Sequence, residues 1–114
     1  MEVHFRSNYP SRFWIAILAY DPENCGGEGG DWIAAGWWTV AKGENVYAFE
    51  TDNRYFAYYA EAEDGRIVSG DLPVYVIDDR FYICYRPVSS ASYPVAMVRV
   101  DGGADADVCV VQLD

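Results

Sequence analysis

The sequence predicts an all-β domain, an antiparallel β-sandwich or an irregular barrel of about nine short strands. Three observations lead to this fold class. Aromatic and β-branched residues fill the apolar runs, turn residues separate the runs at the regular spacing of sandwiches and barrels, and Gly or Pro interrupts every segment long enough for a periodic helix. A chain of 114 residues has the size of one domain, so we expect residues 1–114 to form a single unit.

The first strong strand signal is Phe13–Tyr20, which is apolar on both alternating faces and lies between Pro10 and Pro22. A strand that is apolar on both faces is typical of a central position that is covered on each side. The Gly-rich segment Asp21–Gly30 that follows is expected to be a loop.

The stretch Asp31–Val40 holds three of the four tryptophans. Strict strand alternation places Trp32 and Trp38 on one face and Trp37 on the other. We therefore expect Trp32 and Trp38 in the core and Trp37 as a contact for a partner. Gly36 lies between them and can mark a bulge or a place where an aromatic ring lies over the strand.

Gly43 is expected to form the turn of a hairpin that joins the tryptophan strand to Asn45–Phe49. The next strand, Arg54–Glu63, places Tyr55 and Tyr59 on the same face and ends at a hairpin signal, Asp64–Gly65. The remaining expected strands are Arg66–Val68, Val74–Ile77, Phe81–Tyr85, Pro94–Val100 and Val108–Leu113, with a polar connection at Arg86–Pro94.

The composition argues against some classes of partner. The net charge is −10, from 18 acidic and 8 basic residues. This balance argues against direct nucleic-acid binding and against an anionic membrane surface, because both depend on cations. No run of apolar residues is long enough for a membrane span. Basic proteins are the natural complement, although an acidic surface also serves solubility alone.

The three cysteines form no metal-binding pattern. Cys109 lies in an apolar run and is interpreted as a small buried hydrophobic residue. Cys25 could reach Cys84, but sequence alone leaves this pairing open. Residues Met1–Arg6 carry no signal-peptide pattern, so we expect cytoplasmic synthesis, with any export depending on a dedicated machine.

Several segments together resemble a bacterial domain-of-unknown-function family, numbered ten thirty-six. The residues that carry the resemblance are Phe13–Ile17, Ala19–Asp21, Trp32, Gly36–Trp38, Arg54–Tyr55, Tyr58–Glu61, Gly65 and Gly70–Asp71. The resemblance spans about Phe5 to Tyr85 and implies a shared fold, but no activity. Family members commonly have a Pro and a Cys after the Gly-Trp-Trp strand; Ala41–Asn45 has neither, so a family disulfide there is not expected.

Catalysis is not expected. The single histidine, His4, lies near a terminus that we expect to fray, and no second histidine can complete a metal or nucleophile site. Glu61 and Glu63 lie on one strand face and could mimic a glycosidase pair, but a charged outer strand face is the simpler interpretation.

Calcium is the one candidate cofactor, at acidic loops. Asp21, Glu23 and Asp31 flank the Gly-rich loop, but Cys25 and Trp32 occupy positions where a calcium loop needs oxygen ligands. Further acidic side chains cluster at Asp52 and at Asp101, Asp105 and Asp107. Such loops are more often solvated turns.

The preferred hypothesis is a non-catalytic binding module that recognises a protein or a glycan through an aromatic face with an acidic rim. Its candidate residues are Trp37, Tyr55, Tyr59, Glu61 and Glu63. One alternative is an acidic inhibitor that mimics nucleic-acid charge with Glu61, Glu63, Asp64, Asp78 and Asp79. Another is a small effector or structural component of a secretion or phage-like assembly.

Overall fold

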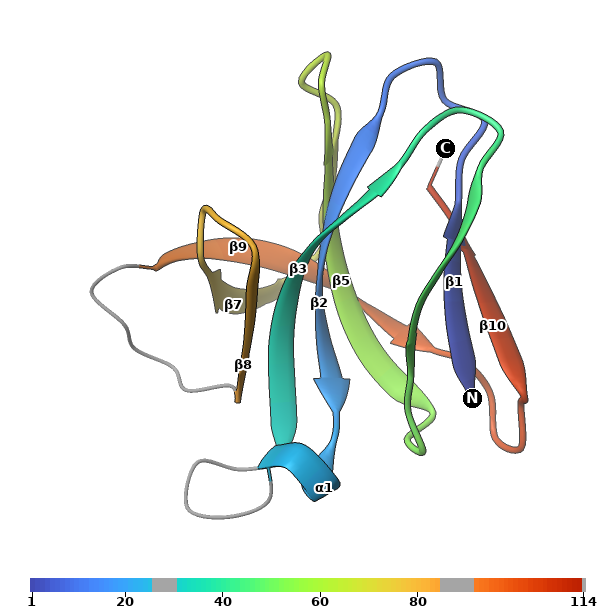
Figure 1. Ribbon diagram of the computed structural model, residues 1–114, viewed down its shortest axis with the longest axis vertical. Coiled ribbons are helices and arrows are strands. Elements are labelled where there is room, and N and C mark those ends of the chain that lie inside the picture. Colours follow the sequence, from blue (N-terminus) through green and yellow to red (C-terminus); the bar gives the residue numbers. More distant parts are fainter. Residues whose placement is uncertain (26–30, 85–91, 114) are drawn as a thin grey trace.

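The computed structural model describes residues 1–25, 31–84 and 92–113, and these form an all-β, sandwich-like fold with ten strands (Figure 1). The strands are β1 (Glu2–Arg6), β2 (Phe13–Tyr20), β3 (Trp32–Val40), β4 (Asn45–Glu50), β5 (Tyr55–Ala62), β6 (Ile67–Val68), β7 (Leu72–Val76), β8 (Phe81–Cys84), β9 (Tyr93–Asp101) and β10 (Val108–Gln112). The fold class expected from the sequence is confirmed.

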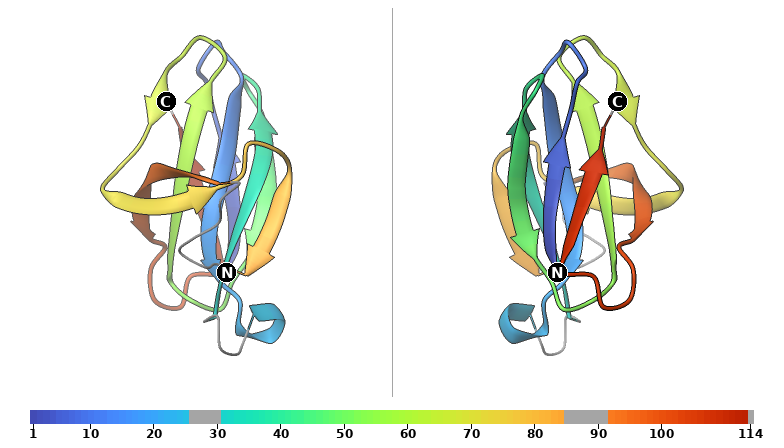
Figure 2. Two further views of the ribbon diagram at one scale, coloured as in Figure 1. Left: turned by 90° about the vertical axis from the view of Figure 1, so that its left-hand side faces the viewer. Right: turned by 90° about the vertical axis from the view of Figure 1, so that its right-hand side faces the viewer.

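The strands form two sheets that pack together. The large sheet has the order β7-β9-β5-β2-β3-β8, with β6 paired to β5, and the small sheet has the order β10-β1-β4. Among the described strands, every pair is antiparallel except β1 with β10. The small sheet covers one face of the upright strands β2, β3 and β5, while β7 and part of β9 run across the opposite side (Figure 2). The large sheet is therefore curled rather than flat.

Two hydrophobic clusters lie on the two faces of the large sheet. We call the face toward the small sheet the inner face and the opposite face the outer face. The inner cluster includes Phe5, Phe13, Ile15, Ile17, Phe56 and Tyr58. The outer cluster includes Ala16, Leu18, Ala57, Tyr59, Val76 and Met97. Residues of β2 contribute to both clusters, which confirms Phe13–Tyr20 as a central strand covered on each side.

Strand β1 corrects the expectation of a frayed N-terminus. It is the central strand of the small sheet, and Val3 and Phe5 are fully buried. The alternation of these two residues with Glu2, His4 and Arg6 is the period-two signal of a half-buried strand. His4 is held in the sheet, where its Nδ1 lies 3.1 Å from Oδ1 of Asn45.

The expected hairpin around Gly43 is also wrong. Gly43 has the positive φ that the turn requires, at 84°, but β4 pairs with β1 of the small sheet and not with β3. The turn is tied to the β1–β2 connection, because the Gly43 N–H donates to the Ser7 carbonyl over 2.7 Å. Gly43 therefore carries the chain from one sheet to the other. The Asp64–Gly65 hairpin is confirmed by the pairing of β5 with β6.

A single helical turn, α1 (Pro22–Cys25), begins the segment that was expected to be a loop throughout. The side chain of Asp21 caps it by accepting from the Asn24 N–H, and Pro22 occupies the first position, where a missing N–H costs nothing. Cys25 forms a disulfide with Cys84, with a Cα–Cα distance of 5.3 Å, which settles the pairing that the sequence left open. Cys109 is half-buried, with a free thiol whose pKa is raised by burial.

Residues 26–30 of the expected Gly-rich loop and residues 85–91, which include most of the expected connection Arg86–Pro94, lie outside the described residues. The last two residues of that expected connection, Tyr93 and Pro94, belong to β9. Within the described ranges, α1 has only four residues, and no helix is long and apolar enough to cross a membrane.

Candidate functional site

The outer face of β5 carries the side chains of Tyr55, Ala57, Tyr59 and Glu61, as the alternation predicts. Strands β7 and β9 cross the middle of this face. Ala57 and Tyr59 lie beneath them in the outer cluster, and only 8% of the Tyr59 surface is exposed. The aromatic face expected from the sequence is therefore not continuous. Its two ends remain open and form two separate pockets.

The pocket at the Tyr55 end is an apolar groove of about 690 Å³, which we call the Trp32–Tyr55 groove. Strands β2, β3, β5, β7 and β9 all contribute to it. Its lining residues are Leu18, Trp32, Tyr55, Phe56, Ala57, Leu72, Arg99, Val100 and Asp101. A concave, mainly apolar surface with a few polar groups at its edge is typical of ligand-binding sites.

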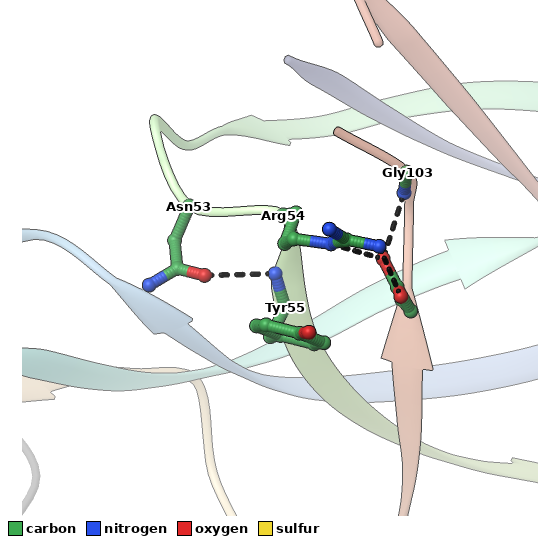
Figure 3. Close-up of polar contacts among 5 residues, drawn as sticks. Asn53, Arg54, Tyr55 and Gly103 are labelled. Carbon is green, nitrogen blue, oxygen red and sulfur yellow. Dashed lines mark hydrogen bonds and ion pairs between the residues drawn. The ribbon is translucent and has the colours of Figure 1, made fainter. Parts of the chain in front are cut away.

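Tyr55 stands at the edge of this groove with 52% of its surface exposed, and its neighbours hold it in place (Figure 3). Its backbone N–H donates to Oδ1 of Asn53 over 2.9 Å. The guanidinium of Arg54 lies over the ring, with its central carbon 5.2 Å from the ring centroid. Such a cation–π contact restrains an exposed ring without covering it.

Arg54 is in turn fixed by Asp101. Two parallel hydrogen bonds, of 2.8 and 2.7 Å, join the guanidinium to the carboxylate, which also accepts from the Gly103 N–H over 2.9 Å. These hydrogen bonds, with that from Arg54 the largest, lower the pKa of Asp101. A bidentate pair fixes both geometry and charge. Tyr55 is thus pre-organised before any ligand arrives.

The pocket at the Glu61 end has a volume of about 440 Å³, and we call it the aromatic–acidic pocket. It is lined by Trp14, Trp37, Thr39, Glu61, Asp78 and Arg80. Trp14 lies in register between Thr39 of β3 and Glu61 of β5, so these three side chains form a row across the sheet. Trp37 and Glu61 were expected from the sequence as site residues, and they meet here.

A shift in the register of β3 places Trp37 in this pocket. Ile15 pairs with Trp38 and Ala16 pairs with Gly36, so no residue of β2 lies opposite Trp37. The extra residue reverses the alternation after Gly36. Trp37 consequently joins Trp32 on the outer face, while Trp38 packs on the inner face. The expectation that Trp32 and Trp38 share a face is therefore wrong.

Gly36 has the two properties that the sequence suggested. The register shift occurs at this residue, and the ring of Phe81 lies over it, so that an added Cβ would come within 2.8 Å of a ring carbon. Trp37 is only partly exposed. Its indole N–H donates to the Ile77 carbonyl over 2.9 Å, and its ring makes edge contacts with Tyr59 and Phe81.

The other expected site residues lie elsewhere or are covered. Tyr59 is buried and cannot present its ring to a partner; its hydroxyl donates to Glu61 over 3.1 Å, and burial is the main cause that raises its pKa to about 12. Glu63 lies outside both pockets, 3.9 Å from Arg12. Asp64 accepts from the Tyr9 hydroxyl, and Asp79 accepts from the Arg80 backbone.

Of the three calcium candidates, Asp21 has its carboxylate engaged by neighbouring side chains. The carboxylate of Asp21 accepts from Asn24 and from the Tyr82 hydroxyl, which lowers its pKa, and Glu23 is exposed on α1. The Asp31 carbonyl accepts from the Asp21 N–H. In the part of the chain that the structure describes, no three His, Cys, Asp or Glu side chains lie close enough to hold a metal ion.

Sequence reasoning missed several residues of the two pockets. Trp14 was assigned only to a covered strand, although its alternation with Ala16 and Leu18 places it on the outer face. Trp32 was expected in the core, yet it lines the groove. Leu72 and Arg99 gave no local signal, because their role depends on how β7 and β9 cross the sheet.

Comparison with known proteins finds no matching family model, no matching curated protein and no matching solved structure. The resemblance to family ten thirty-six stays a prediction.

Proposed function

We propose that this chain is a non-catalytic binding module that seats an apolar side chain of a partner protein in the Trp32–Tyr55 groove. The observation that carries the proposal is an apolar groove of about 690 Å³ beside an exposed tyrosine ring held by Arg54 and Asp101. A ring that is restrained by a cation–π contact loses less conformational entropy on binding than a free ring, so more of the contact energy contributes to affinity. Tyrosine and tryptophan are also among the residues that dominate protein interfaces.

The lining favours a protein partner over a glycan. Leu18, Ala57 and Leu72 offer no hydrogen bonds to sugar hydroxyls, and the polar groups of Arg99 and Asp101 lie among the lining residues with partners of their own. An apolar or aromatic side chain needs no such bonds. The net charge of −10 favours a partner that is basic around this anchor.

We also propose that the chain does not catalyse a reaction. The single histidine belongs to β1 in the small sheet and is engaged with Asn45, whereas the groove is formed by strands of the large sheet. The Cys25–Cys84 disulfide supports action in an oxidising compartment, which fits export of the chain after synthesis.

A peptide selection tests the proposal. Random peptides displayed on phage are selected on the wild-type protein and then measured against Tyr55→Ala. We expect enriched peptides to share an aromatic or long aliphatic residue and to bind Tyr55→Ala about tenfold more weakly, as for an interface hot spot. Tyr47→Ala is the matched control, because Tyr47 is a similarly exposed tyrosine on the small sheet.

Enriched peptides that bind the wild type and Tyr55→Ala equally well would contradict the proposal. So would binding on a glycan array that depends on Tyr55 while no peptide is enriched, because it would move the ligand to another class.

A further inference from the structure

We propose that the aromatic–acidic pocket is a second binding site, specific for an alkylammonium group such as that of a lysine side chain or a small quaternary amine. The site combines two indole rings, from Trp14 and Trp37, with two carboxylates, from Glu61 and Asp78. Tryptophan is the aromatic side chain that attracts cations most strongly, and a carboxylate beside it supplies the opposite charge. This inference is independent of the Trp32–Tyr55 groove.

Hydrogen bonds and strand pairing hold the side chains that line the pocket in place. The indole N–H of Trp37 is bonded to the Ile77 carbonyl at 2.9 Å, which fixes the plane of the ring. The Tyr59 hydroxyl donates to Oε2 of Glu61 over 3.1 Å and orients that carboxylate from the buried side. Trp14 lies between Glu61 and Thr39 through the pairing of three adjacent strands.

The two carboxylates have no cation bound to them among the described residues. The three ion pairs in these ranges are Arg12–Glu63, Arg54–Asp101 and Arg99–Asp71. Glu61 and Asp78 take part in none of them. Burial is the main cause that raises the pKa of Tyr93, and the charges of Asp78 and Glu61 raise it further. Both carboxylates therefore act on the same neighbouring phenol.

Arg80 also lines the pocket, and its charge distinguishes a cationic ligand from the competing class of ligand, a glycan. A guanidinium repels an ammonium group but donates hydrogen bonds to sugar hydroxyls. Two carboxylates against one guanidinium leave the pocket with a net negative charge, which favours the cation. Removal of Arg80 should therefore have opposite effects on the two kinds of ligand.

The test is an NMR titration of the whole protein with choline, followed through the indole N–H signals of the tryptophans. The neutral isostere 3,3-dimethylbutan-1-ol controls for size, and Nα-acetyl-lysine amide tests the protein side chain against the free quaternary amine. We expect the Trp14 and Trp37 signals to move with choline or the lysine derivative, and the Trp38 signal to stay. Binding of either cation supports the proposal. The cation that binds more tightly shows whether the ligand is a lysine side chain or a free quaternary amine.

Substitutions of the acidic residues and of Arg80 should change the affinity for the cation in opposite directions. Glu61→Gln and Asp78→Asn should each weaken cation binding about threefold to tenfold, and Arg80→Gln should strengthen it. Glu63→Gln is the matched control, because this glutamate directly follows the end of β5 but is paired with Arg12 outside the pocket. Equal binding of choline and its isostere, no binding of either cation, or weaker binding by Arg80→Gln would each overturn the proposal.

Discussion

At the scale of single residues, Tyr55 and Tyr59 show that the position of a tyrosine in the fold decides whether its ring is exposed or buried. They are the same residue type on the same face of β5, four positions apart, and the sequence treats them alike. The structure leaves Tyr55 52% exposed and Tyr59 only 8% exposed, because β7 and β9 cross over the second and not the first. Tyr59 is therefore a core residue, and Tyr55 is free to contact a partner.

Alanine substitutions should separate these two roles. We expect Tyr59→Ala to lower the free energy of unfolding by about 2 to 4 kcal/mol, because it leaves a cavity in the outer cluster. Tyr55→Ala should cost about 1 kcal/mol or less, since mainly the contact with Arg54 is lost. Urea denaturation measures both values. Similar losses for the two variants would contradict the burial described here.

The pair formed by Arg54 and Asp101 leads to a prediction about acid. The hydrogen bond from Arg54 lowers the pKa of Asp101 in the folded protein, so its stabilising effect is present above the ordinary carboxyl pKa and is lost as the pH falls through the folded value. The lowered pKa values of Asp21 and Asp64 act in the same direction.

We therefore expect stability to decrease between about pH 5 and about pH 2, and Asp101→Asn to show a shallower decrease over the same range. Urea midpoints measured across this range check the prediction. An Asp101→Asn variant with the same pH dependence as the wild type would show that the pair with Arg54 does not titrate as described.

At the scale of strands, the sequence predicts well what depends on neighbouring residues. Phe13–Tyr20 is identified as a central strand because its own residues are apolar on both faces, and Asp64–Gly65 is identified as a hairpin because a short turn sets its pairing. The partner of β4 depends on β1, which lies about forty positions earlier in the chain. No local pattern specifies such a pairing.

The division of the outer face into two pockets has one local and one long-range cause. A single extra residue at Gly36 reverses the alternation of β3 and moves Trp37 to the outer face, and strict alternation cannot include it. The division of the outer face depends on Val74, Val76 and Met97 of β7 and β9, which come from a later part of the chain. The sequence identifies Trp37, Tyr55 and Glu61 as site residues, but it cannot assign them to separate sites.

The disulfide gives a prediction at the element scale, because it ties α1 to β8 across 59 positions of the chain. A crosslink over such a loop restricts the unfolded chain, so the double variant Cys25→Ala, Cys84→Ala should be less stable by about 2 to 4 kcal/mol. Cys109→Ala is the control, because that thiol is free. Calorimetric melting under non-reducing conditions measures the difference, and equal melting temperatures for the double variant and the wild type would contradict the crosslink.

At the scale of the whole molecule, the large sheet carries a hydrophobic cluster on each face, and the second cluster leaves room for sites at its two ends. The acidic residues proposed for nucleic-acid mimicry are interleaved with cations rather than arranged in one row. Glu63 lies beside Arg12, and Glu61 and Asp78 share a pocket with Arg80. Charge mimicry stays a prediction, and strongly salt-sensitive binding to a basic protein would support it.

The central claim is that the Trp32–Tyr55 groove binds an apolar side chain. The most direct measurement is a titration of the isotope-labelled protein with N-acetyl-tryptophan amide, followed in the amide and indole N–H signals. We expect the signals of the Trp32 indole and of the Tyr55, Ala57 and Arg99 amides to shift together, and the Trp38 indole signal to stay. Tyr55→Ala should weaken the effect. Shifts that avoid the groove, or that are unchanged in Tyr55→Ala, would contradict it.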